Sequence, residues 1–392
     1  MSYDTQTSES GTRLIAAAQA FQSELKERAP EIEEARRLPA ELSTRFAEAG
    51  FYRMLVPEVY GGLEASPLDF TRTIETLAQA DGAAAWCSFI AASSGTVLAM
   101  LPEESARTIF ATPETLICGV FAPRGKAVVC EGGFQVSGEW QWGSGTQNAD
   151  WVLAGCQVIR DGKPELLGNG TPRSRMMIVP AEEVEFLDTW YVSGLSGTGS
   201  TDYAIRDRFV PEDRAVGIGV DGPLPRPLYA FPQFGLLGMG IAAVALGLAR
   251  AAIDELVDIA GGKTPSGSAR PLAARAGAQT ETARAEATLR SARAFFYEAV
   301  TDAWEAALRD GRITTEHRRD IRLATTHATH ASAEAVDRMY HLAGGSSVYR
   351  RSPLQRIFRD VHVATQHMMV GPGTLELTGR LLLGLETDTA ML

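Results

Sequence analysis

Residues 138–151 read GEWQWGSGTQNADW, and the rest of the chain is organised around this stretch. It contains three of the six tryptophans and three glycines, together with Ser144 and Thr146, and it carries little charge. The residues before it predict a strand that runs into a turn, and residues 151–153 begin a second apolar strand. Large flat rings beside glycine and hydroxyl positions suit a pocket for a planar ligand. A tryptophan-rich hairpin in a barrel core would show the same pattern, so this stretch alone favours neither interpretation.

Composition limits the classes of partner. The chain has 392 residues, which is enough for two or three domains that each bury a core. Its 45% hydrophobic and 22% charged residues are typical of a soluble globular protein. A net charge of −11 without a basic run makes nucleic acid and anionic membranes poor partners. We find no signal-peptide pattern and no apolar stretch approaching the ~20 residues of a membrane-spanning helix.

Metal-binding patterns are weak. His327 and His330 lie one helical turn apart, with Glu334 one turn further on, which is compatible with a metal site. No fourth ligand is evident, so we interpret them as ordinary helix residues. The cysteines fall in no metal-like spacing, and we therefore expect no metal and a reduced, cytoplasmic setting. The four are Cys87, Cys118, Cys130 and Cys156.

The predicted secondary structure changes twice along the chain. Apolar residues at helical spacing fill the first third, where Pro30 and Pro39 are expected to separate short helices. Over residues 116–211, β-branched and aromatic residues alternate with turn dipeptides, as in a small barrel or sandwich. Helical patterns return from Gly235 to the end. We therefore predict an α+β fold with a helical N-terminal domain (1–114), a middle β-barrel domain (115–220) and a C-terminal helical bundle (221–392).

His367 is the leading candidate for chemistry. Periodicity predicts a helix over residues 352–368, and His367 lies off its apolar stripe, on a side shared with Asp360. An imidazole near a helix end can carry a proton or donate a hydrogen bond near neutral pH. A solvated or capping histidine fits the same periodicity, and on periodicity alone that is the stronger interpretation.

A short glycine- and serine-containing segment has two open interpretations. Gly344, Gly345 and Ser346 follow a predicted helix and could direct amides and a hydroxyl at a phosphate. A helix C-cap followed by a loop explains them equally well. No Gly-x-Ser-x-Gly elbow occurs, and neither does the glycine-rich fingerprint of a dinucleotide-binding fold.

Six stretches, taken in order, resemble the acyl-CoA dehydrogenase superfamily, and within it the flavin-dependent monooxygenases that serve as oxygenase components of two-component systems. Each stretch is weakly specific alone, but six in family order span nearly the whole chain. They are AAAWCSF (83–89), FAPRGKA (121–127), GEWQWGSGTQNADW (138–151), WYVSGLSGTGSTDYAIRDRFVPEDR (190–214), LAARAGAQTETARAEA (272–287) and PLQRIFRDVHVATQH (353–367).

The resemblance implies a fold and a set of site residues. The fold is a helical N-terminal domain, a middle β-barrel and a C-terminal four-helix bundle, assembled as a homotetramer. Ser144 would contact the N5 edge of the flavin, and His367 would lie near the oxygen chemistry. The remaining expected flavin contacts are Trp86, Phe121 and Trp142 around the ring system, with Gln279, Gly344, Gly345 and Ser346 on the phosphate side, often of a neighbouring subunit.

Departures from the dehydrogenase pattern favour the monooxygenase branch of the superfamily over the acyl-CoA dehydrogenases. Common acyl-CoA dehydrogenases carry a catalytic glutamate in a Glu-Gly-Thr motif where this chain has His367, and their flavin loop is replaced here by FAPRGKA. The nearest later carboxylate, Glu376, fits a helix position instead. Arginine is frequent in the family where this chain has Ser196, so contacts at that position differ.

The function implied by the resemblance is a monooxygenase that uses reduced FMN or FAD, supplied by an NAD(P)H:flavin reductase, and O2. It would oxygenate a small, commonly aromatic substrate through a flavin C4a-hydroperoxide. Tyr229, Phe231 and Phe234 are candidates for the substrate wall, and packing at a domain boundary explains them equally well. The alternative functions are an acyl-CoA dehydrogenase-like flavin oxidoreductase and an inactive flavin-binding oligomer.

Overall fold

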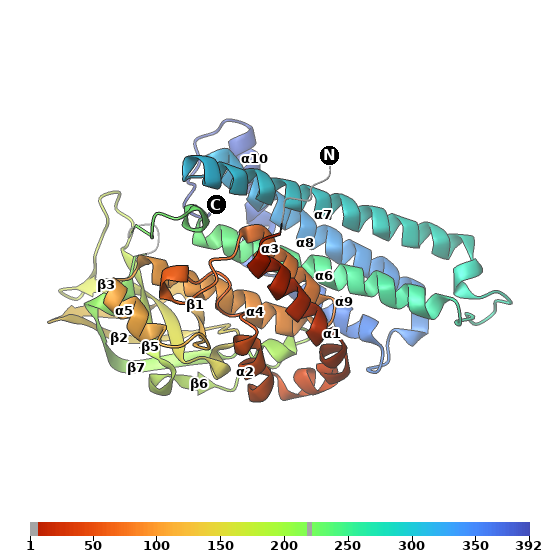
Figure 1. The fold of residues 1–392 in the computed structure, drawn as a ribbon, viewed down its shortest axis with the longest axis horizontal. Coiled ribbons are helices and arrows are strands. Elements are labelled where there is room, and N and C mark those ends of the chain that lie inside the picture. The colour runs from red at the N-terminus through yellow and green to blue at the C-terminus, as the bar shows by residue number, and fades with distance from the viewer. Residues whose placement is uncertain (1–6, 218–221) are drawn as a thin grey trace.

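The computed structural model describes residues 7–217 and 222–392, and it places a curved sheet at one end of an elongated helical body (Figure 1). The N-terminal helices and the sheet lie against one end of the long C-terminal helices. The N-terminal helices are α1 (Glu9–Ala35), α2 (Ala40–Glu48), α3 (Pro67–Ala78), α4 (Gly82–Ser94) and α5 (Glu103–Ile109).

Helix α1 differs from the expectation that Pro30 separates two helices. It runs unbroken through Pro30, from a Ser8 cap whose side chain accepts from the Gly11 amide to Arg36 in left-handed conformation. A proline inside a helix removes one backbone hydrogen bond and crowds the preceding turn. Leu25, Ala29 and Ile32 are fully or almost fully buried on the same helix, and this packing offsets that cost.

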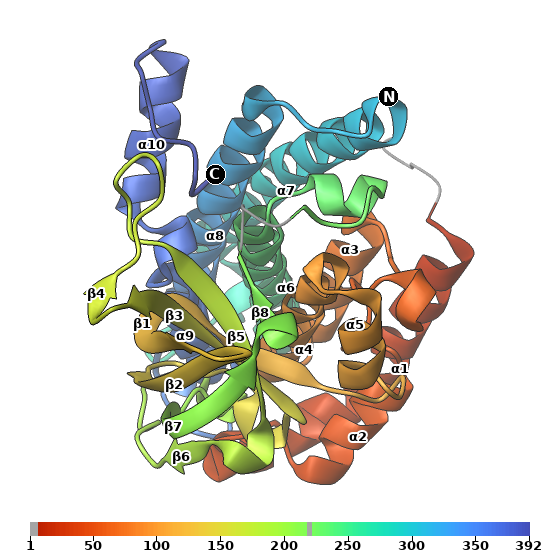
Figure 2. The ribbon, with the colours of Figure 1, turned by 90° about the vertical axis from the view of Figure 1, so that its left-hand side faces the viewer.

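The eight strands form one rolled, open sheet with the path β6-β7-β2-β1-β3-β5-β8, and β4 pairs only with β3 (Figure 2). All pairs are antiparallel except β1 with β3. Side chains from β1, β2, β3, β5, β7 and β8 fill a single core in which Trp140 stacks on Tyr203 at 5.4 Å. The sheet therefore rolls like a barrel, but its edge strands β6 and β8 do not pair with each other within the described residues. The strands are β1 (Ile117–Cys130), β2 (Gly133–Trp140), β3 (Trp151–Arg160), β4 (Lys163–Pro164), β5 (Ser174–Pro180), β6 (Glu185–Leu187), β7 (Asp202–Pro211) and β8 (Ala215–Val216).

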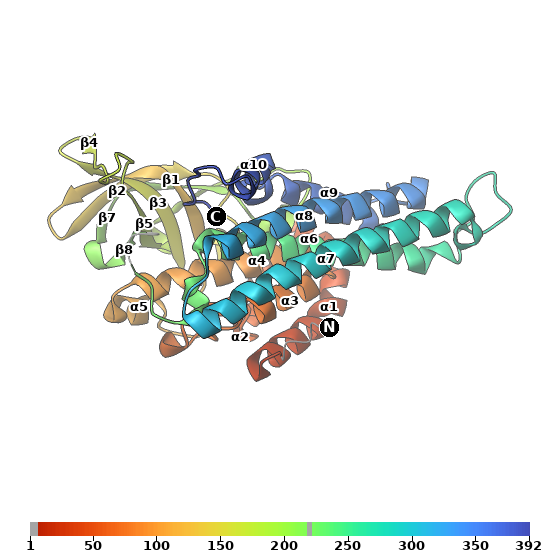
Figure 3. The same ribbon diagram turned by 90° about the horizontal axis from the view of Figure 1, so that it is seen from above.

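Three long helices and the shorter α9 run side by side in the C-terminal part, and a second short helix packs on α8 (Figure 3). They are α6 (Gln233–Ala260), α7 (Ala276–Asp310), α8 (Thr315–Ala343) and α9 (Pro353–Thr365), followed by α10 (Pro372–Leu382). Element type changes between Ile109 and Ile117, and again after Val216. The predicted boundary at 220/221 lies outside the described residues, so the domain limits stay a prediction.

Helix α6 lies at the centre of the molecule, between α8 and the N-terminal helices α3 and α4. Glycines allow this close approach, because a Cβ on Gly240 would meet Phe89 at 2.5 Å and one on Gly247 would meet the Glu75 carbonyl at 2.4 Å. Glu75 on α3 also accepts hydrogen bonds from Arg293 at 2.7 Å and Tyr297 at 2.6 Å, both on α7. These contacts join the N-terminal helices firmly to the bundle.

Two apolar helical segments are longer than we predict from the sequence. Residues Gly82–Met100 and helix Gln233–Ala260 have the length and composition of membrane-spanning helices, contrary to our expectation of none. In the fold, 94% and 89% of their most apolar windows are buried inside the protein. Their apolar character is therefore accounted for by core packing.

Candidate active site

Trp86 and Ser144 meet where α4 reaches the sheet domain. The indole Nε1 of Trp86 donates to Ser144 Oγ at 3.2 Å, and both side chains are 6% exposed. Trp86 is placed by α4, which is capped by the Asp81 side chain accepting from the Ala84 amide at 2.8 Å. Ser144 lies in the turn that follows β2. Two residues far apart in sequence are thus brought together.

The turn carrying Ser144 is paired with a second loop, residues 195–201. The Gly143 amide donates to the Thr201 carbonyl and the Gly145 amide to the Thr198 carbonyl, each at 3.0 Å. Gly145 has φ +73°, and a Cβ there would stand 3.1 Å from Cys118 Sγ. Side chains continue the pairing, because Ser144 Oγ lies 2.6 Å from Ser200 Oγ, which lies 2.6 Å from Thr198 Oγ1. The position of Ser144 is therefore fixed by backbone and side chain together.

His367 closes the site from the other side. Its ring centroid is 6.0 Å from that of Trp86, at an interplanar angle of 59°. The predicted helix around it is too long: α9 ends at Thr365, and His367 is extended (φ −71°, ψ 134°), where its Nδ1 accepts from the Met369 amide at 3.2 Å. This side-chain cap starts a short turn and removes His367 from the polar side shared with Asp360.

The protonation state of His367 follows from these contacts. Because Nδ1 accepts a backbone N–H, the neutral ring carries its hydrogen on Nε2, which has no hydrogen-bond partner among the described residues. Burial, together with the positive charge of Arg322, lowers the pKa of His367 to about 4. Near pH 7 the side chain is therefore a neutral donor rather than a proton reservoir.

Arg322 on α8 organises the region behind His367. It is buried, and its guanidinium donates to three carbonyls, those of Met369 at 3.0 Å, Phe234 at 3.1 Å and Met391 at 2.9 Å. Burial lowers the pKa of Arg322 to about 10, which still leaves it charged at neutral pH. A single cation thus links the His367 turn, the start of α6 and the C-terminus.

Asp360 on α9 anchors the loop that pairs with Ser144. Its buried carboxylate accepts from the Leu195 amide at 2.6 Å, and Leu195 has φ +52°. Arg359 next to it donates to the Ser193 carbonyl at 2.7 Å, and a Cβ on Gly194 would meet the Arg359 carbonyl at 2.4 Å. Burial raises the pKa of Asp360 to about 7.

Three aromatic residues expected near the flavin or substrate lie in different settings from Trp86. Trp142 is 66% exposed with φ +67°, and its amide donates to Asp202 at 3.3 Å. Phe121 on β1 and Phe234 on α6 are half-buried and meet edge to face at 6.3 Å. Phe234 also reaches the His367 region through Arg322.

The other two residues of the expected substrate wall are core residues. Tyr229 is buried and donates to the Leu55 carbonyl at 3.2 Å, and burial raises its pKa. Phe231 is 4% exposed and lies 6.2 Å from the Trp304 ring. Their contacts are those of packing between the N-terminal helices and the bundle.

The residues expected on the phosphate side lie far from Ser144 in the same chain. Gln279, near the start of α7, and Gly344–Ser346, after the end of α8, are at the bundle end away from the sheet (Figure 1). Arg322, beside the His367 turn, precedes Gly344 by 22 residues of α8, which corresponds to ~33 Å of helix. They can meet a flavin at Ser144 only if a second copy of the chain supplies them.

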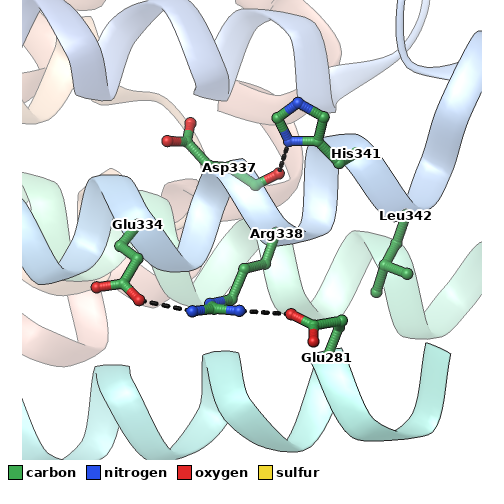
Figure 4. A pocket seen from close by; sticks show the side chains of 6 residues that line it. All are labelled: Glu281, Glu334, Asp337, Arg338, His341 and Leu342. Carbon is green, nitrogen blue, oxygen red and sulfur yellow. Dashed lines mark hydrogen bonds and ion pairs between the residues drawn. The ribbon is translucent and has the colours of Figure 1, made fainter. Parts of the chain in front are cut away.

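A hollow of about 340 Å³ lies between α7 and α8 close to this bundle end (Figure 4). Arg338 at its centre pairs with Glu334 at 2.7 Å and Glu281 at 2.5 Å, and His341 Nδ1 donates to the Asp337 carbonyl at 2.7 Å. Its lining includes none of the Trp86, Ser144 and His367 side chains. The described residues also contain no cluster of three potential metal ligands. The candidate active site is therefore the Trp86–Ser144–His367 region.

Sequence reasoning missed several residues that hold this region together. Ser200 and Thr198 stand in a quoted motif but were given no role, and Arg322 was not singled out at all. A helical arginine without a nearby acidic residue at helical spacing gives no signal that it is buried. The hydroxyl contacts join segments 56 residues apart, and no local pattern encodes such a contact.

Comparisons with known proteins identify the family of the chain. Family models described as acyl-CoA dehydrogenase N-terminal and C-terminal domains match residues 9–106 and 239–372. An indole-3-acetate monooxygenase from Pseudomonas putida is 35% identical over 94% of this chain and 95% of its own length. A flavin-dependent monooxygenase oxygenase subunit, HsaA, from Mycobacterium tuberculosis is 30% identical over 92% of each chain.

Solved structures give the same result at the level of the fold. The crystal structure of 3-HSA hydroxylase from Rhodococcus sp. RHA1 superposes with a TM-score of 0.89 at 27% identity, covering 99% of this chain and 100% of that one. The HsaA monooxygenase from M. tuberculosis superposes with a TM-score of 0.88 at 28% identity, covering 97% and 100%.

Proposed function

The chain belongs to the acyl-CoA dehydrogenase family, in its flavin-dependent monooxygenase branch, and we propose that it hydroxylates a small aromatic molecule. The single observation that carries this proposal is the convergence of Trp86, Ser144 and His367 without a carboxylate. No described Asp or Glu side chain hydrogen-bonds to these three residues, and Glu376 is exposed on α10. Abstraction of an α-proton from an acyl thioester therefore has no evident base here.

The residues present fit a flavin. Ser144 Oγ offers a hydrogen-bonding atom at a buried loop, the Nε2–H of His367 is free to donate, and the exposed ring of Trp142 is available to cover a planar group. When bound, reduced flavin supplies the electrons and activates O2. Ser144 would hold the ring system, and Trp86 would keep water from the space between Ser144 and His367.

His367 would act as a hydrogen-bond donor to substrate or to oxygen. Its lowered pKa keeps Nε2–H in place across the neutral pH range, and its Nδ1 contact with Met369 fixes the ring. Phe121 and Phe234 offer an aromatic edge for the substrate. Arg322 binds both the backbone carbonyl of Phe234 and the Met369 carbonyl in the turn after His367. An aromatic substrate also agrees with the names of the relatives, which include an indole-3-acetate monooxygenase and a resorcinol hydroxylase.

A separate flavin reductase is the required partner, as in other two-component systems. Purified chain with flavin alone should oxidise NADH only slowly, and adding an NADH:flavin reductase should start oxygen uptake. Product formation from a panel of indoles and phenols then tests the proposed function. Rapid NADH oxidation by the chain without a reductase would contradict it.

The assembly we propose is a homotetramer in which a neighbour supplies Gln279 and Gly344–Ser346. The ~33 Å of α8 between Arg322, beside the His367 turn, and Gly344 supports it, as do the exposed Leu375, Leu382 and Leu383 of the α10 region. Light scattering would show the oligomer. Mixing a Ser144→Ala chain with a Gly345→Glu chain under exchange conditions should restore part of the activity that each lacks, and a monomer with full activity would exclude this assembly.

A further inference from the structure

The hydroxyl groups of Thr198, Ser200 and Ser144 form a continuous series with a fixed direction. Thr198 Oγ1 donates its only hydrogen to the Leu195 carbonyl at 2.7 Å. In the 2.6 Å contact between Thr198 and Ser200, Ser200 must therefore be the donor. Its hydrogen is then used, so Ser144 must be the donor in the 2.6 Å contact with Ser200.

This direction decides what Ser144 offers to a ligand. A serine hydroxyl has one hydrogen and two lone pairs. The hydrogen points to Ser200, and one lone pair accepts from Trp86 Nε1 at 3.2 Å. A ligand atom that meets Ser144 Oγ therefore meets an acceptor, and it must bring its own hydrogen.

The two oxidation states of a flavin differ in this respect. Reduced flavin carries a hydrogen on N5, whereas N5 of oxidised flavin is a bare acceptor. We propose that Ser200 and Thr198 are positioning residues that hold Ser144 as an acceptor, so that the site selects the reduced cofactor. The inference rests on the proposed function, because it places the N5 edge of the flavin at Ser144.

The start of the series is held from outside the site. Leu195, whose carbonyl takes the hydrogen of Thr198, has φ +52° and is fixed by its amide bond to Asp360. The Thr198 carbonyl in turn accepts from the Gly145 amide at 3.0 Å. Reversal of the hydroxyl direction would break the 2.7 Å hydrogen bond from Thr198 Oγ1 and leave the buried Leu195 carbonyl with only the longer bond from the Thr198 amide at 3.1 Å. Backbone contacts therefore hold the series in one direction.

The test measures flavin binding rather than turnover. Dissociation constants for FMN and FAD are determined anaerobically, in the oxidised form and in the dithionite-reduced form, for the full-length chain. The variants are Ser200→Ala, which frees the Ser144 hydrogen, and Thr198→Val, which removes the acceptor of Ser200. Ser88→Ala is the matched control, because it deletes a buried hydroxyl on α4 whose one hydrogen bond to the described residues is with the Ala84 carbonyl at 2.9 Å.

Wild type should bind the reduced form of at least one flavin more tightly. In Ser200→Ala, Ser144 can turn its hydrogen to oxidised N5, so oxidised flavin should bind more tightly and the preference for reduced flavin should fall about fivefold or more. Thr198→Val should also lower the preference for reduced flavin, and Ser88→Ala should leave this preference unchanged. A purely structural role would weaken both oxidation states together.

The outcomes separate the two proposals. Suppose that reduced flavin binds to wild type while Ser200→Ala and Thr198→Val both keep the wild-type ratio of oxidised to reduced dissociation constants. That result overturns the role of the hydroxyl series and leaves the proposed function standing. If wild type binds neither flavin in either state, the proposed function fails first. If Ser200→Ala does not fold, as judged by circular dichroism, Thr198→Val carries the test, and the same ratio decides it.

Discussion

Trp86 on α4 and Ser144 after β2 share a hydrogen bond of 3.2 Å, although 58 residues separate them in sequence. This contact joins the helical N-terminal part to the sheet at the place where His367 also arrives. The candidate active site therefore lies where three parts of the fold meet, and none of them contains it alone. Its geometry depends on the packing of α4 and α9 as much as on the serine itself.

Trp86→Phe tests this contact while it keeps an aromatic ring at the position and leaves a smaller cavity than alanine would. The ring packing against Phe89 (4.8 Å) and His367 is kept, but the donor to Ser144 is lost. We expect a modest loss of folding stability, about 1 kcal/mol, and a looser Ser144 that shows as more H2O2 released per NADH consumed. Trp86→Ala should instead cost about 3–5 kcal/mol through the cavity it leaves. Equal uncoupling in both variants would mean that the indole N–H has no separate role.

His367→Ala should leave the fold intact, because the ring is half-buried and lies outside α9. Loss of a donor at a developing charge typically costs about 10²-fold in rate, so product formation should fall by this order while H2O2 rises. His367→Asn, which retains an N–H donor, should recover part of the loss. Unchanged coupling in the alanine variant would remove His367 from the mechanism.

The pKa of His367, lowered to about 4, also gives a pH prediction. Because the unfolded ring titrates near 6.5, the unfolded state binds more protons between about pH 6.5 and 4. The contribution of His367 to stability therefore falls as the pH drops through this window. Thermal melting of His367→Asn should be less sensitive to pH between 6.5 and 4.5 than that of wild type.

Asp360 should change the pH dependence of stability in the direction opposite to His367, and Asp360→Asn tests this. The pKa of Asp360 is raised to about 7, so between about pH 4 and 7 the folded state holds a proton that the unfolded state has released. Wild-type stability should therefore decline as the pH rises to 7. The asparagine oxygen can still accept from the Leu195 amide, so the variant should lose less stability than wild type between pH 5.5 and 8. A parallel pH profile in both proteins would show that Asp360 is already ionised in the fold.

Arg322→Met should be strongly destabilising. The buried guanidinium satisfies the carbonyls of Met369, Phe234 and Met391, and methionine satisfies none of them. A hydrogen bond that involves a charged group contributes about 1.5–3 kcal/mol, so the loss of all three should lower the free energy of urea unfolding by several kcal/mol. Arg318→Met provides a control on the same helix, because Arg318 bonds to a single carbonyl, that of Thr389 at 2.7 Å. An equal effect of the two substitutions would refute the special role of Arg322.

Much of the architecture was readable from sequence, because the helical and strand periods and the turn dipeptides follow from local chemistry. The errors have physical causes. Pro30 is tolerated because tertiary burial around Leu25 and Ile32 outweighs a local penalty, and α9 ends early because the His367 side chain caps the next turn. The six-motif resemblance pointed to Trp86, Ser144 and His367, and the structure brings these three together. The Ser144–Ser200 contact and the contacts of Arg322 join distant segments, which no local pattern encodes.

The most direct test of the account follows oxygen atoms. The purified chain is mixed with an NADH:flavin reductase, flavin, NADH, an aromatic substrate from the indole and phenol panel, and isotopically labelled O2. We predict that mass spectrometry finds one labelled oxygen atom in the product, and that Ser144→Ala diverts the electrons to H2O2. If no labelled product forms with any aromatic substrate, while an acyl-CoA is desaturated by the same chain without oxygen, the monooxygenase account is contradicted.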